Sequence, residues 1–544
     1  MNDQRIGLPF APALVAALIL AYALTGLVGH APWKTEDAIG VGIVHQMLAH
    51  GHWTLPYLAG EPFVEDGPLY YWIAAFFARV FSPLFALHDG ARLASALLII
   101  CTLFTVRLTA RKLYGRTEGD NALLVLLGCL GLLVHTHETM GEIGMLAALA
   151  AAWYALALGP RRAVKSGTIL GAALAATYLS KGSAAVVPPV LVAMLLPLAS
   201  PAWRHRAYLK TLALAALVYG LAAGSWLAVL HAHAPNLFWQ WTEAQNESWS
   251  VGAMETIGYY LETLSWSAWP AWPIALWYLW DRRRALFAPA TRAVQIPGVL
   301  LPLAVAVITL VVILFQRHPR ELQALPMLLP LSLLAGAGTE TLRRGAANAL
   351  AWFGALTFSL FGGLVWLGWI AMMTGTPGQI ARNFAKLEPG FKPVFQWLPL
   401  LVAVAFTAAW VALLARSPRG AQRSVSFWAA GTTVLWGLLM TLWLPWIDYG
   451  KTYAPVAQAL GRAIPRGASC IESRNLGESQ RAVFDYYAGV VTMRAEAQRR
   501  ISCPVLLVQA RPGDEDGFSA QGWRRVWEGN RPRDHERYRL YVRR

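Results

Sequence analysis

Long apolar runs separated by short polar loops follow one another through most of the chain. Many runs reach roughly 18–25 residues, the length that crosses the hydrocarbon core of a bilayer. The first, at 8–29, is too long for the apolar core of a signal peptide, and no small-residue cleavage site follows it. We therefore expect it to remain as a helix, and the pattern predicts an all-α polytopic membrane protein.

Basic loops constrain how many of these runs cross the membrane. If every run crosses, about fourteen helices result, and the basic loop 107–116 lies outside, against the positive-inside rule. If the aromatic segment 68–87 lies in the interface instead, the basic loops fall on the cytoplasmic side. We therefore predict about thirteen transmembrane helices and a cytoplasmic N-terminus. The expected spans are 8–29, 91–107, 123–134, 143–158, 168–180, 184–198, 211–231, 264–280, 297–315, 322–339, 347–373, 395–415 and 425–444.

The C-terminal segment, 446–544, follows a different pattern from the membrane domain at 1–445. Short alternating runs predict strands, and one stretch predicts a helix. The strands are expected at 468–472, 504–509 and 537–542, and the helix at 478–487. This composition predicts a small α/β domain, which the topology places in the periplasm.

Two of the four cysteines lie in this C-terminal segment. In the periplasm, Cys470 and Cys503 could form a disulfide, because that compartment is oxidising. Cys101 and Cys129 lie inside apolar runs and are expected to be inert residues of the core.

Composition and charge exclude several classes of protein. With 56% hydrophobic and 14% charged residues in 544, a soluble enzyme is excluded. The net charge of +16 could suggest a nucleic-acid partner, but the basic residues lie mainly in short loops, where anionic membrane lipid is the expected neighbour. The 25 tryptophans suit interfacial belts. A transporter would show inverted repeats and polar residues along its helices, and we see no such repeat.

The polar loop after the first span, at 30–68, concentrates chemically active side chains on the outer face. It contains the adjacent acids Glu36 and Asp37 near its start, and Glu65 and Asp66 near its end. Further polar segments on the same face are expected at 135–142, 231–263, 316–323 and 375–392. The predicted site therefore lies at the periplasmic surface of the membrane.

Three stretches carry a resemblance to a known family. They are Glu36-Asp37 with the later Gly67-Pro68-Leu69-Tyr70-Tyr71-Trp72, then Ala91-Arg92-Leu93, then Leu179-Ser180-Lys181-Gly182. Asn246 and the segment 317–326 match the same family less closely. In this order they resemble the C-type glycosyltransferases (GT-C fold) that use polyprenyl-phosphate sugars, such as the lipid A aminoarabinose transferase and the protein O-mannosyltransferases. The resemblance covers roughly residues 10–340.

The resemblance implies transfer of a sugar from an undecaprenyl-phosphate-type carrier to a lipid or glycan acceptor, with inversion, at the periplasmic face of a bacterial inner membrane. Such a reaction needs a carboxylate base and cations that stabilise the departing phosphate. Glu36 or Asp37 is the expected base, and the choice between them stays open. The expected substrate-binding residues are Arg92, Lys181, Arg317, His318, Arg320, Asn246, Tyr70 and Trp72.

Three acids, Glu65, Asp66 and Glu142, are candidate ligands for a divalent metal, because carboxylate oxygens suit hard cations. The alternative is a polar rim around the substrate cavity, so the need for a metal cofactor stays open.

The chain also departs from the family pattern. Asp66-Gly67-Pro68-Leu69 stands where the lipid A enzyme has Lys-Pro-Pro-Leu, and Gln323 or Ala324 stands where a tyrosine is expected. A donor and acceptor other than those of the lipid A enzyme are therefore expected. A non-catalytic lipid-binding protein or a flippase is the alternative function.

Overall fold

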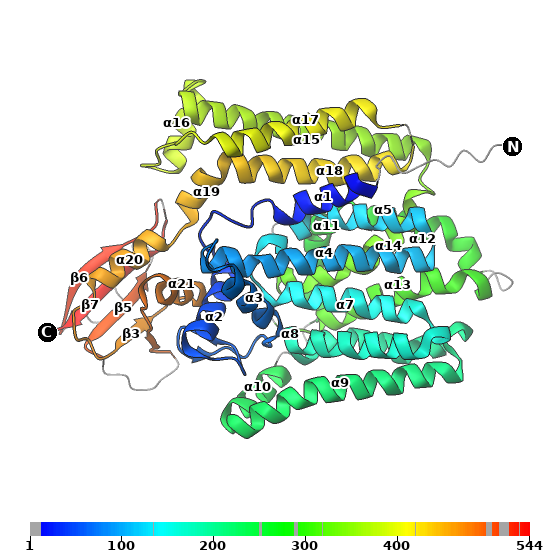
Figure 1. The fold of residues 1–544 in the computed structure, drawn as a ribbon, viewed down its shortest axis with the longest axis horizontal. Coiled ribbons are helices and arrows are strands. Elements are labelled where there is room, and N and C mark those ends of the chain that lie inside the picture. The colour runs from blue at the N-terminus through cyan, green and yellow to red at the C-terminus, as the bar shows by residue number, and fades with distance from the viewer. Residues whose placement is uncertain are drawn as a thin grey trace.

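The computed structural model describes residues 12–133, 135–247, 249, 253–287, 292–317, 319–418, 420–496, 503–510, 522–532 and 534–544. It has two parts: a bundle of long helices that run side by side, and a small sheet domain at one end of the bundle (Figure 1). The long helices of the bundle are α1 (Pro12–Leu24), α4 (Leu87–Leu113), α5 (Arg116–Leu127), α7 (Gly141–Leu158), α8 (Ala163–Ala199), α9 (Arg206–His233), α12 (Ala271–Phe287), α13 (Arg292–Leu314), α14 (Leu328–Thr339), α15 (Arg344–Thr374), α17 (Trp397–Arg416) and α18 (Gln422–Leu438).

Further helices and helical turns complete the helical part of the molecule. They are α6 (Leu130–Leu133), α10 (Pro235–Glu247), α11 (Ala253–Ser267), the turn η4 (Glu321–Met327), α16 (Gly378–Leu387), the π-helical turn η5 (Leu439–Trp443) and α19 (Leu444–Lys451). Within the described residues, nine helices are long and apolar enough to cross a membrane, or ten if α5 and α6 form one broken span. The chain is thus a mostly helical, multi-pass membrane protein.

Helix α8 is a helical hairpin, although its 37 residues follow without a loop. Lys181 and Gly182 have non-helical backbone angles and interrupt it midway. Ser166, near its start, donates a hydrogen bond to the carbonyl of Ala155, and Trp203, just after its end, donates one to the carbonyl of Leu156. Both ends of α8 therefore lie beside the same end of α7, and the 181–182 break is the tip of the hairpin. This agrees with the separate spans predicted at 168–180 and 184–198.

The outer loop folds into short elements at the end of the bundle that carries the sheet domain. They are α2 (Glu36–His50), the strands β1 (Tyr57–Leu58) and β2 (Glu61–Pro62), and α3 (Leu69–Phe81). At 13 residues, α3 is about 20 Å long, whereas a bilayer core measures about 30 Å. It is therefore shorter than the core, and its position in the interface stays a prediction.

The C-terminal part is built on a mixed sheet with strand order β4-β3-β5-β7-β6. Strand β3 is parallel to β4 and β5, and β7 is antiparallel to β5 and β6. The predicted strands at 468–472, 504–509 and 537–542 and the helix at 478–487 are confirmed, whereas α20, β4 and β6 were not predicted. The elements are α20 (Ala454–Ala463), β3 (Ile471–Arg474), α21 (Glu478–Ala488), β4 (Met493–Arg494), β5 (Val505–Ala510), β6 (Trp523–Gly529) and β7 (Arg537–Arg543).

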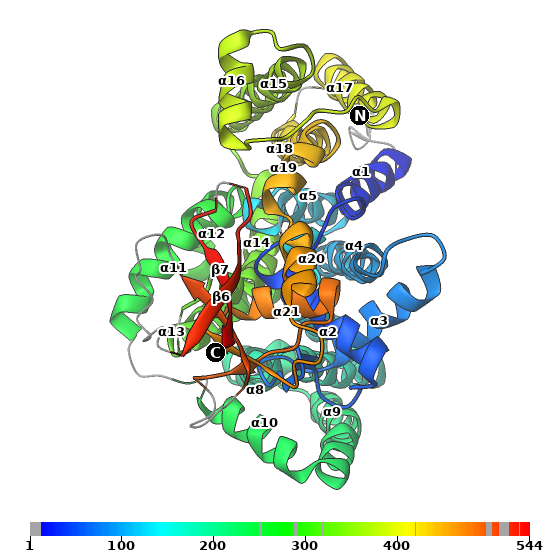
Figure 2. The same ribbon diagram turned by 90° about the vertical axis from the view of Figure 1, so that its left-hand side faces the viewer.

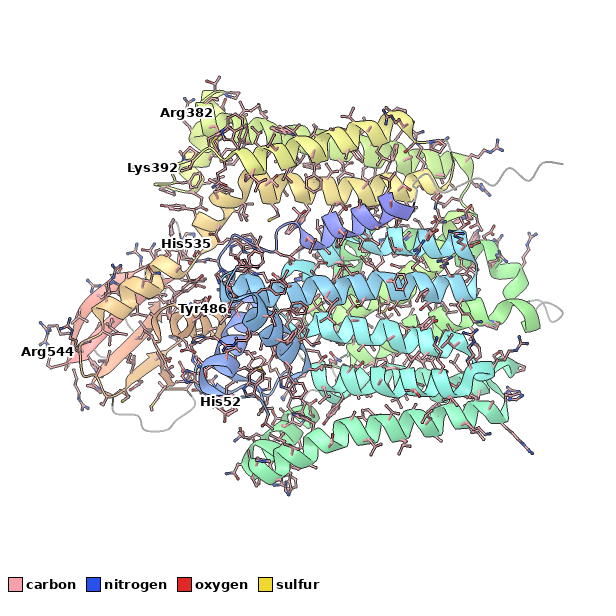
Figure 3. All side chains as sticks on the ribbon, viewed as in Figure 1. His52, Arg382, Lys392, Tyr486, His535 and Arg544 are labelled. Carbon is pink, nitrogen blue, oxygen red and sulfur yellow. A yellow bond between two sulfur atoms is a disulfide. The ribbon has the colours of Figure 1, made fainter. Side chains whose placement is uncertain are left out.

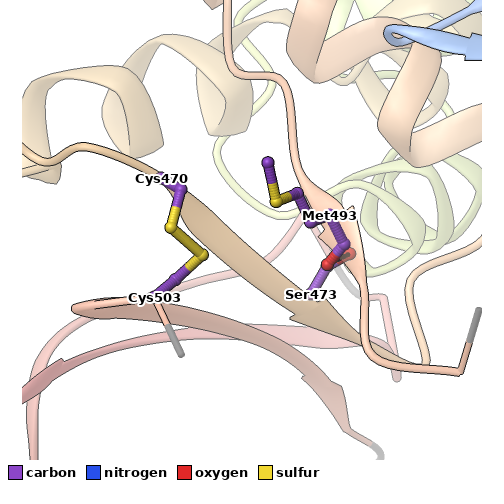
Figure 4. Close-up of a disulfide and its surroundings, with 4 residues drawn as sticks. All are labelled: Cys470, Ser473, Met493 and Cys503. Atoms are coloured by element: carbon purple, nitrogen blue, oxygen red, sulfur yellow. Dashed lines mark hydrogen bonds between the residues drawn. A yellow bond between two sulfur atoms is a disulfide. The ribbon is translucent and has the colours of Figure 1, made fainter. Parts of the chain in front are cut away.

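A disulfide between Cys470 and Cys503 joins the segments that precede two neighbouring strands, β3 and β5 (Figure 4). The two cysteines that the sequence offered for a disulfide are thus paired. The other two are free: Cys129 is buried as expected, but Cys101 is exposed on α4, where the bundle faces lipid.

The sheet domain covers the outer loop through α21, which packs on α2 (Figure 2). The side-chain amide of Gln46 donates to Asp485 at 2.5 Å, and Arg481 pairs with Glu61 at 3.1 Å. Figure 3 labels Tyr486 at the junction. Its hydroxyl lies 2.9 Å from Nδ1 of His88. The helix that begins at Glu36 is therefore held between the bundle and the C-terminal domain.

Candidate active site

Asp37 and Arg92 form a buried ion pair in which every nitrogen of the guanidinium is used. Arg92 donates from Nη2 to Oδ2 of Asp37 at 2.6 Å and from Nε to Oδ1 at 3.2 Å. Its other hydrogen bonds go to Asp89 and to backbone carbonyls of residues 27–31. Asp37 also accepts from the backbone N–H of Thr139 at 2.9 Å. Burial would raise the pKa of the Asp37 carboxyl, but the charge and hydrogen bonds of Arg92 outweigh burial and lower it.

Glu36, the neighbouring acid, has a different environment. Its carboxylate is half-buried, and the charges of Glu142, Lys181 and Asp66 act on it. Among the described residues, none donates a hydrogen bond to it. Burial, followed by the negative charge of Glu142, raises the pKa of Glu36 to about 7. A carboxylate whose pKa lies near neutral pH can take up a proton effectively during a reaction.

Lys181 lies between two carboxylates at the tip of the α8 hairpin. Its ammonium group is hydrogen-bonded to Oδ1 of Asp66 and is 2.7 Å from Oε1 of Glu142. The hydroxyl of Tyr71 donates to the second oxygen of Asp66 at 2.6 Å. In the described structure, Oε2 of Glu142 is buried without a hydrogen-bond partner. Burial raises the pKa of Asp66 to about 6, although Lys181 opposes the shift.

Two glycines allow the three segments of this cluster to approach one another. A Cβ atom at Gly67 would lie 2.1 Å from the carbonyl oxygen of Leu179, and one at Gly141 would lie 2.7 Å from Oδ2 of Asp66. The N–H of Gly67 donates to the carbonyl of Ser180 at 3.0 Å. Any side chain at either glycine would therefore push the loop, α7 and the hairpin tip apart.

A cavity of about 420 Å³ opens beside this cluster. One wall is apolar and comes from α7, the second half of α8, and α13, while its polar end comes from the outer loop, the hairpin tip, α10 and the segment around η4. The residues that line the cavity include Glu65, Glu142, Met145, Leu149, Lys181, Ala184, Pro188, Gln245, Glu247, Val312, Arg317, Arg320 and Gln323. The cavity thus joins apolar surface at membrane depth to a charged outer end.

The structure brings together some of the predicted site residues and separates others. Lys181, Arg317, Arg320, Glu65 and Glu142 line the cavity, and Glu36 lies within reach of their charges.

Four predicted binding residues lie elsewhere. Asn246 is exposed beside the cavity-lining residues of α10. The hydroxyl of Tyr70 is bonded to Ser95, and the indole of Trp72 donates to the carbonyl of Trp53, so neither side chain lines the cavity. Arg92 is engaged by Asp37, as described above. His318 lies outside the described residues.

Comparison with known proteins shows what the chain resembles. A family model described as dolichyl-phosphate-mannose-protein mannosyltransferase matches residues 65–228. The chain is 29% identical over 447 residues to undecaprenyl phosphate-alpha-4-amino-4-deoxy-L-arabinose arabinosyl transferase of Pseudomonas aeruginosa (strain UCBPP-PA14), covering 78% of this chain and 74% of that protein. Its fold is similar to that of ArnT from Cupriavidus metallidurans bound to undecaprenyl phosphate, with a TM-score of 0.70 and 17% identity over 97% of each chain. The chain thus resembles the GT-C polyprenyl-phosphate-sugar glycosyltransferases in sequence and in fold.

The predicted resemblance to these lipid-linked-sugar-dependent glycosyltransferases is therefore confirmed. The apo state of the Cupriavidus metallidurans protein is similar to this chain to the same degree, with a TM-score of 0.69. Because the match extends over 97% of both chains, it includes the C-terminal sheet domain as well as the helices.

The three acids proposed as metal ligands do not form one group in this structure. Asp66 and Glu142 share the ammonium of Lys181, which occupies the position between them. Glu65 pairs instead with Arg320 at 2.9 Å on the surface. Across the described ranges, no three His, Cys, Asp or Glu residues converge as a metal site requires. The structure thus separates Glu65 from the other two acids, and a metal role for the three stays a prediction.

Two residues that support the candidate site were not predicted. The side-chain carbonyl of Gln245 accepts from the N–H of Ser183 at 2.8 Å, and a Cβ at Gly182 would lie 2.0 Å from it. Gln245 thus holds the hairpin tip that carries Lys181. Tyr71 orients Asp66, although the sequence drew attention to the tyrosine before it. The glycine after Lys181, at a φ of +72°, was the available signal for such a close approach.

Proposed function

We propose that this enzyme transfers a sugar from an undecaprenyl-phosphate-type carrier to a lipid or glycan acceptor, with inversion. The observation that carries the proposal is the cavity in which an apolar wall leads to Lys181, Arg317 and Arg320, beside the carboxylate of Glu36. A lipid-linked donor with one phosphate needs an apolar surface for its tail and cations for its phosphate, and the cavity offers both. The sheet-domain end of the bundle is then the periplasmic face of a bacterial inner membrane.

The donor would lie with its isoprenoid tail along the apolar wall and its phosphate at the charged end. Met145, Leu149 and Val312 offer the tail a surface at membrane depth. Lys181 and Arg317 would bind the phosphate, and Arg317 suits it because guanidinium binds phosphate through two nitrogens. The related protein from Cupriavidus metallidurans was solved with undecaprenyl phosphate, which supports this class of carrier.

Glu36 would act as the general base. In a single displacement, the acceptor hydroxyl attacks the anomeric carbon, its proton passes to the carboxylate of Glu36, and the bond from the anomeric carbon to the phosphate oxygen breaks. The carrier phosphate leaves with the bonding electrons, and Lys181 and Arg317 stabilise its charge. One displacement inverts the anomeric centre. Asp37 is the weaker choice because both of its oxygens are held by Arg92.

Substitution of the base tests the reaction directly. Purified protein in proteoliposomes, supplied with undecaprenyl-phosphate sugars, is expected to release undecaprenyl phosphate when an acceptor lipid extract is present. Glu36→Gln should bind the carrier and lose turnover at least a hundredfold, the contribution typical of general base catalysis. Glu262→Gln, at an exposed acid of α11, is the matched control. Unchanged turnover in Glu36→Gln would exclude Glu36 as the base.

The sugar and acceptor are tested by mass spectrometry of envelope lipids and glycans from cells with and without the protein. The expectation of substrates other than those of the lipid A enzyme stays a prediction. It is supported by Asp66, an acid where the lipid A enzyme carries a cation, which here is paired with Lys181. A difference confined to aminoarabinose on lipid A would contradict it.

We also propose the topology of about thirteen transmembrane helices. The two halves of the α8 hairpin would each cross once, and α1 and α12, which have 13 and 17 residues, would cross as short spans. A cysteine introduced at Thr117, in the first turn of α5, should react only with cytoplasmic labels. Labelling from the periplasm would overturn this topology.

A further inference from the structure

A second cavity, of about 410 Å³, lies among α1, α17 and α18, lined by elements that contribute nothing to the candidate active site. Its walls are almost entirely apolar, and several of them are alanines, whose small side chains leave the space open. The lining residues are Leu14, Ala17, Leu18, Ala21, Phe406, Ala409, Trp410, Ala412, Leu413, Arg416, Ser417, Ala430, Thr433 and Val434.

One end of this groove is polar. Arg416 is the last residue of α17, and Ser417 follows it, on the face of the bundle opposite the sheet domain (Figure 1). Arg416 is exposed, and in the described part of the chain no carboxylate pairs with it. From Phe406 to Arg416 the helix rises by ten residue steps, or about 15 Å. That is half of a bilayer core of about 30 Å, so the groove reaches from one surface to the middle of the membrane.

We propose that this groove binds one acyl chain of an anionic phospholipid in the leaflet opposite the sheet domain. The headgroup phosphate would lie against the guanidinium of Arg416 and the hydroxyl of Ser417. The chain would extend past Leu413 and Ala409 to Phe406. The length of the groove fits a chain that occupies a single leaflet, and the charge at its mouth fits an acidic headgroup.

The sugar carrier is a poorer occupant. Its proposed cavity lies among α7, α8 and α13, and opens at the opposite face, beside Lys181. The lipid would instead attach α17 to its neighbours. Only 11% of the most apolar stretch of α17 is buried within the protein, so most of this helix depends on lipid for its packing. The inference does not rest on the proposed sugar transfer.

Native mass spectrometry of the full chain, with phosphatidylglycerol or phosphatidylcholine of identical acyl chains as the probes, tests the site. The wild type should retain one phosphatidylglycerol in preference to phosphatidylcholine. Arg416→Gln should weaken that binding about fivefold, the effect of one basic contact at a membrane surface. Ala409→Phe should abolish it by filling the groove.

Two variants control for charge and for bulk. Arg344→Gln removes another exposed arginine from the same face, and Leu221→Phe enlarges a side chain of α9 that is exposed to lipid. Both should bind phosphatidylglycerol as the wild type does, and all variants should elute as monodisperse protein. Equal binding of the two lipids by the wild type, or wild-type binding by Ala409→Phe, would overturn the proposal.

Discussion

Arg92 binds both oxygens of Asp37, at 2.6 Å and 3.2 Å, and so gives the two adjacent acids of the outer loop different roles. Both residues of the pair are buried, at 0% and 1% exposure. Consecutive residues of a helix point about 100° apart. When Asp37 faces Arg92, Glu36 therefore faces the charges of Lys181, Asp66 and Glu142. The ion pair fixes the first turn of α2, and the position of Glu36 depends on it.

Loss of the Asp37 carboxylate should therefore act on stability. Asp37→Asn leaves Arg92 buried with Asp89 as its remaining acid, and breaking a buried pair costs about 3–5 kcal/mol. We expect a clearly lower Tm in detergent, measured by tryptophan fluorescence, together with poor recovery of protein. Glu36→Gln should keep the wild-type Tm. If Asp37→Asn has a normal Tm and no turnover, Asp37 and not Glu36 is the base.

The pH dependence of turnover should follow the ionisation of the Glu36 carboxyl group. Burial and then Glu142 raise its pKa from 4.5 to about 7, and a base acts only when deprotonated. Turnover should therefore rise with pH up to about 7. Because the folded state holds this proton more tightly than the unfolded chain, Glu36 should also make the free energy of unfolding fall as pH rises from 4.5 to about 7.

A substitution of Glu142 separates Glu36 from other titrating groups. After burial, the negative charge of Glu142 contributes most to the raised pKa of Glu36. Glu142→Gln removes this charge, so the acidic limb of the pH profile, in which turnover rises with pH, should move to lower pH. The measurement is the pH profile of turnover at saturating donor, in which a lower maximal rate does not obscure the position of the limb. A limb that stays in place would assign it to a different group.

Much of the fold follows from periodicity, and the exceptions have physical causes. The helices of the bundle were expected because their apolar runs are long enough to cross a bilayer, and the strands β3, β5 and β7 because short apolar or alternating runs mark them. Strand β6 was missed because its residues are exposed or half-buried on both faces, which gives no alternation. Strand β4 has two residues, too few for any pattern.

Part of the cavity lining could be predicted from the sequence, but the partners of these residues could not. Motif order led to Lys181, Glu142 and Glu65, all of which line the cavity. The role of Arg92 depends on Asp37, 55 positions away, and no local pattern contains such a contact. An arginine at the start of a span can bind a phosphate or an acid of its own chain equally well by charge, and only tertiary structure distinguishes them.

The disulfide should stabilise the C-terminal domain. Cys470 and Cys503 are 33 residues apart, and closing a loop of that length in the unfolded chain contributes at most about 4 kcal/mol. We expect the double variant Cys470→Ala, Cys503→Ala to show a lower Tm and faster proteolysis after 446. Cys101→Ala, at a free cysteine, is the control and should leave both unchanged. Equal protease resistance with and without reductant would contradict the prediction.

Replacement of Lys181 should affect both stability and turnover, and a second substitution separates the two effects. Lys181→Met leaves Asp66 and Glu142 buried without their shared cation, at a cost of about 3–5 kcal/mol. Adding Asp66→Asn removes one of the two charges and keeps an acceptor for the Tyr71 hydroxyl, so the Tm should partly recover. Turnover should stay at least a hundredfold low in both variants, because the cation that stabilises the departing phosphate is missing. If turnover recovers together with the Tm, Lys181 only positions the two acids and does not act on the phosphate.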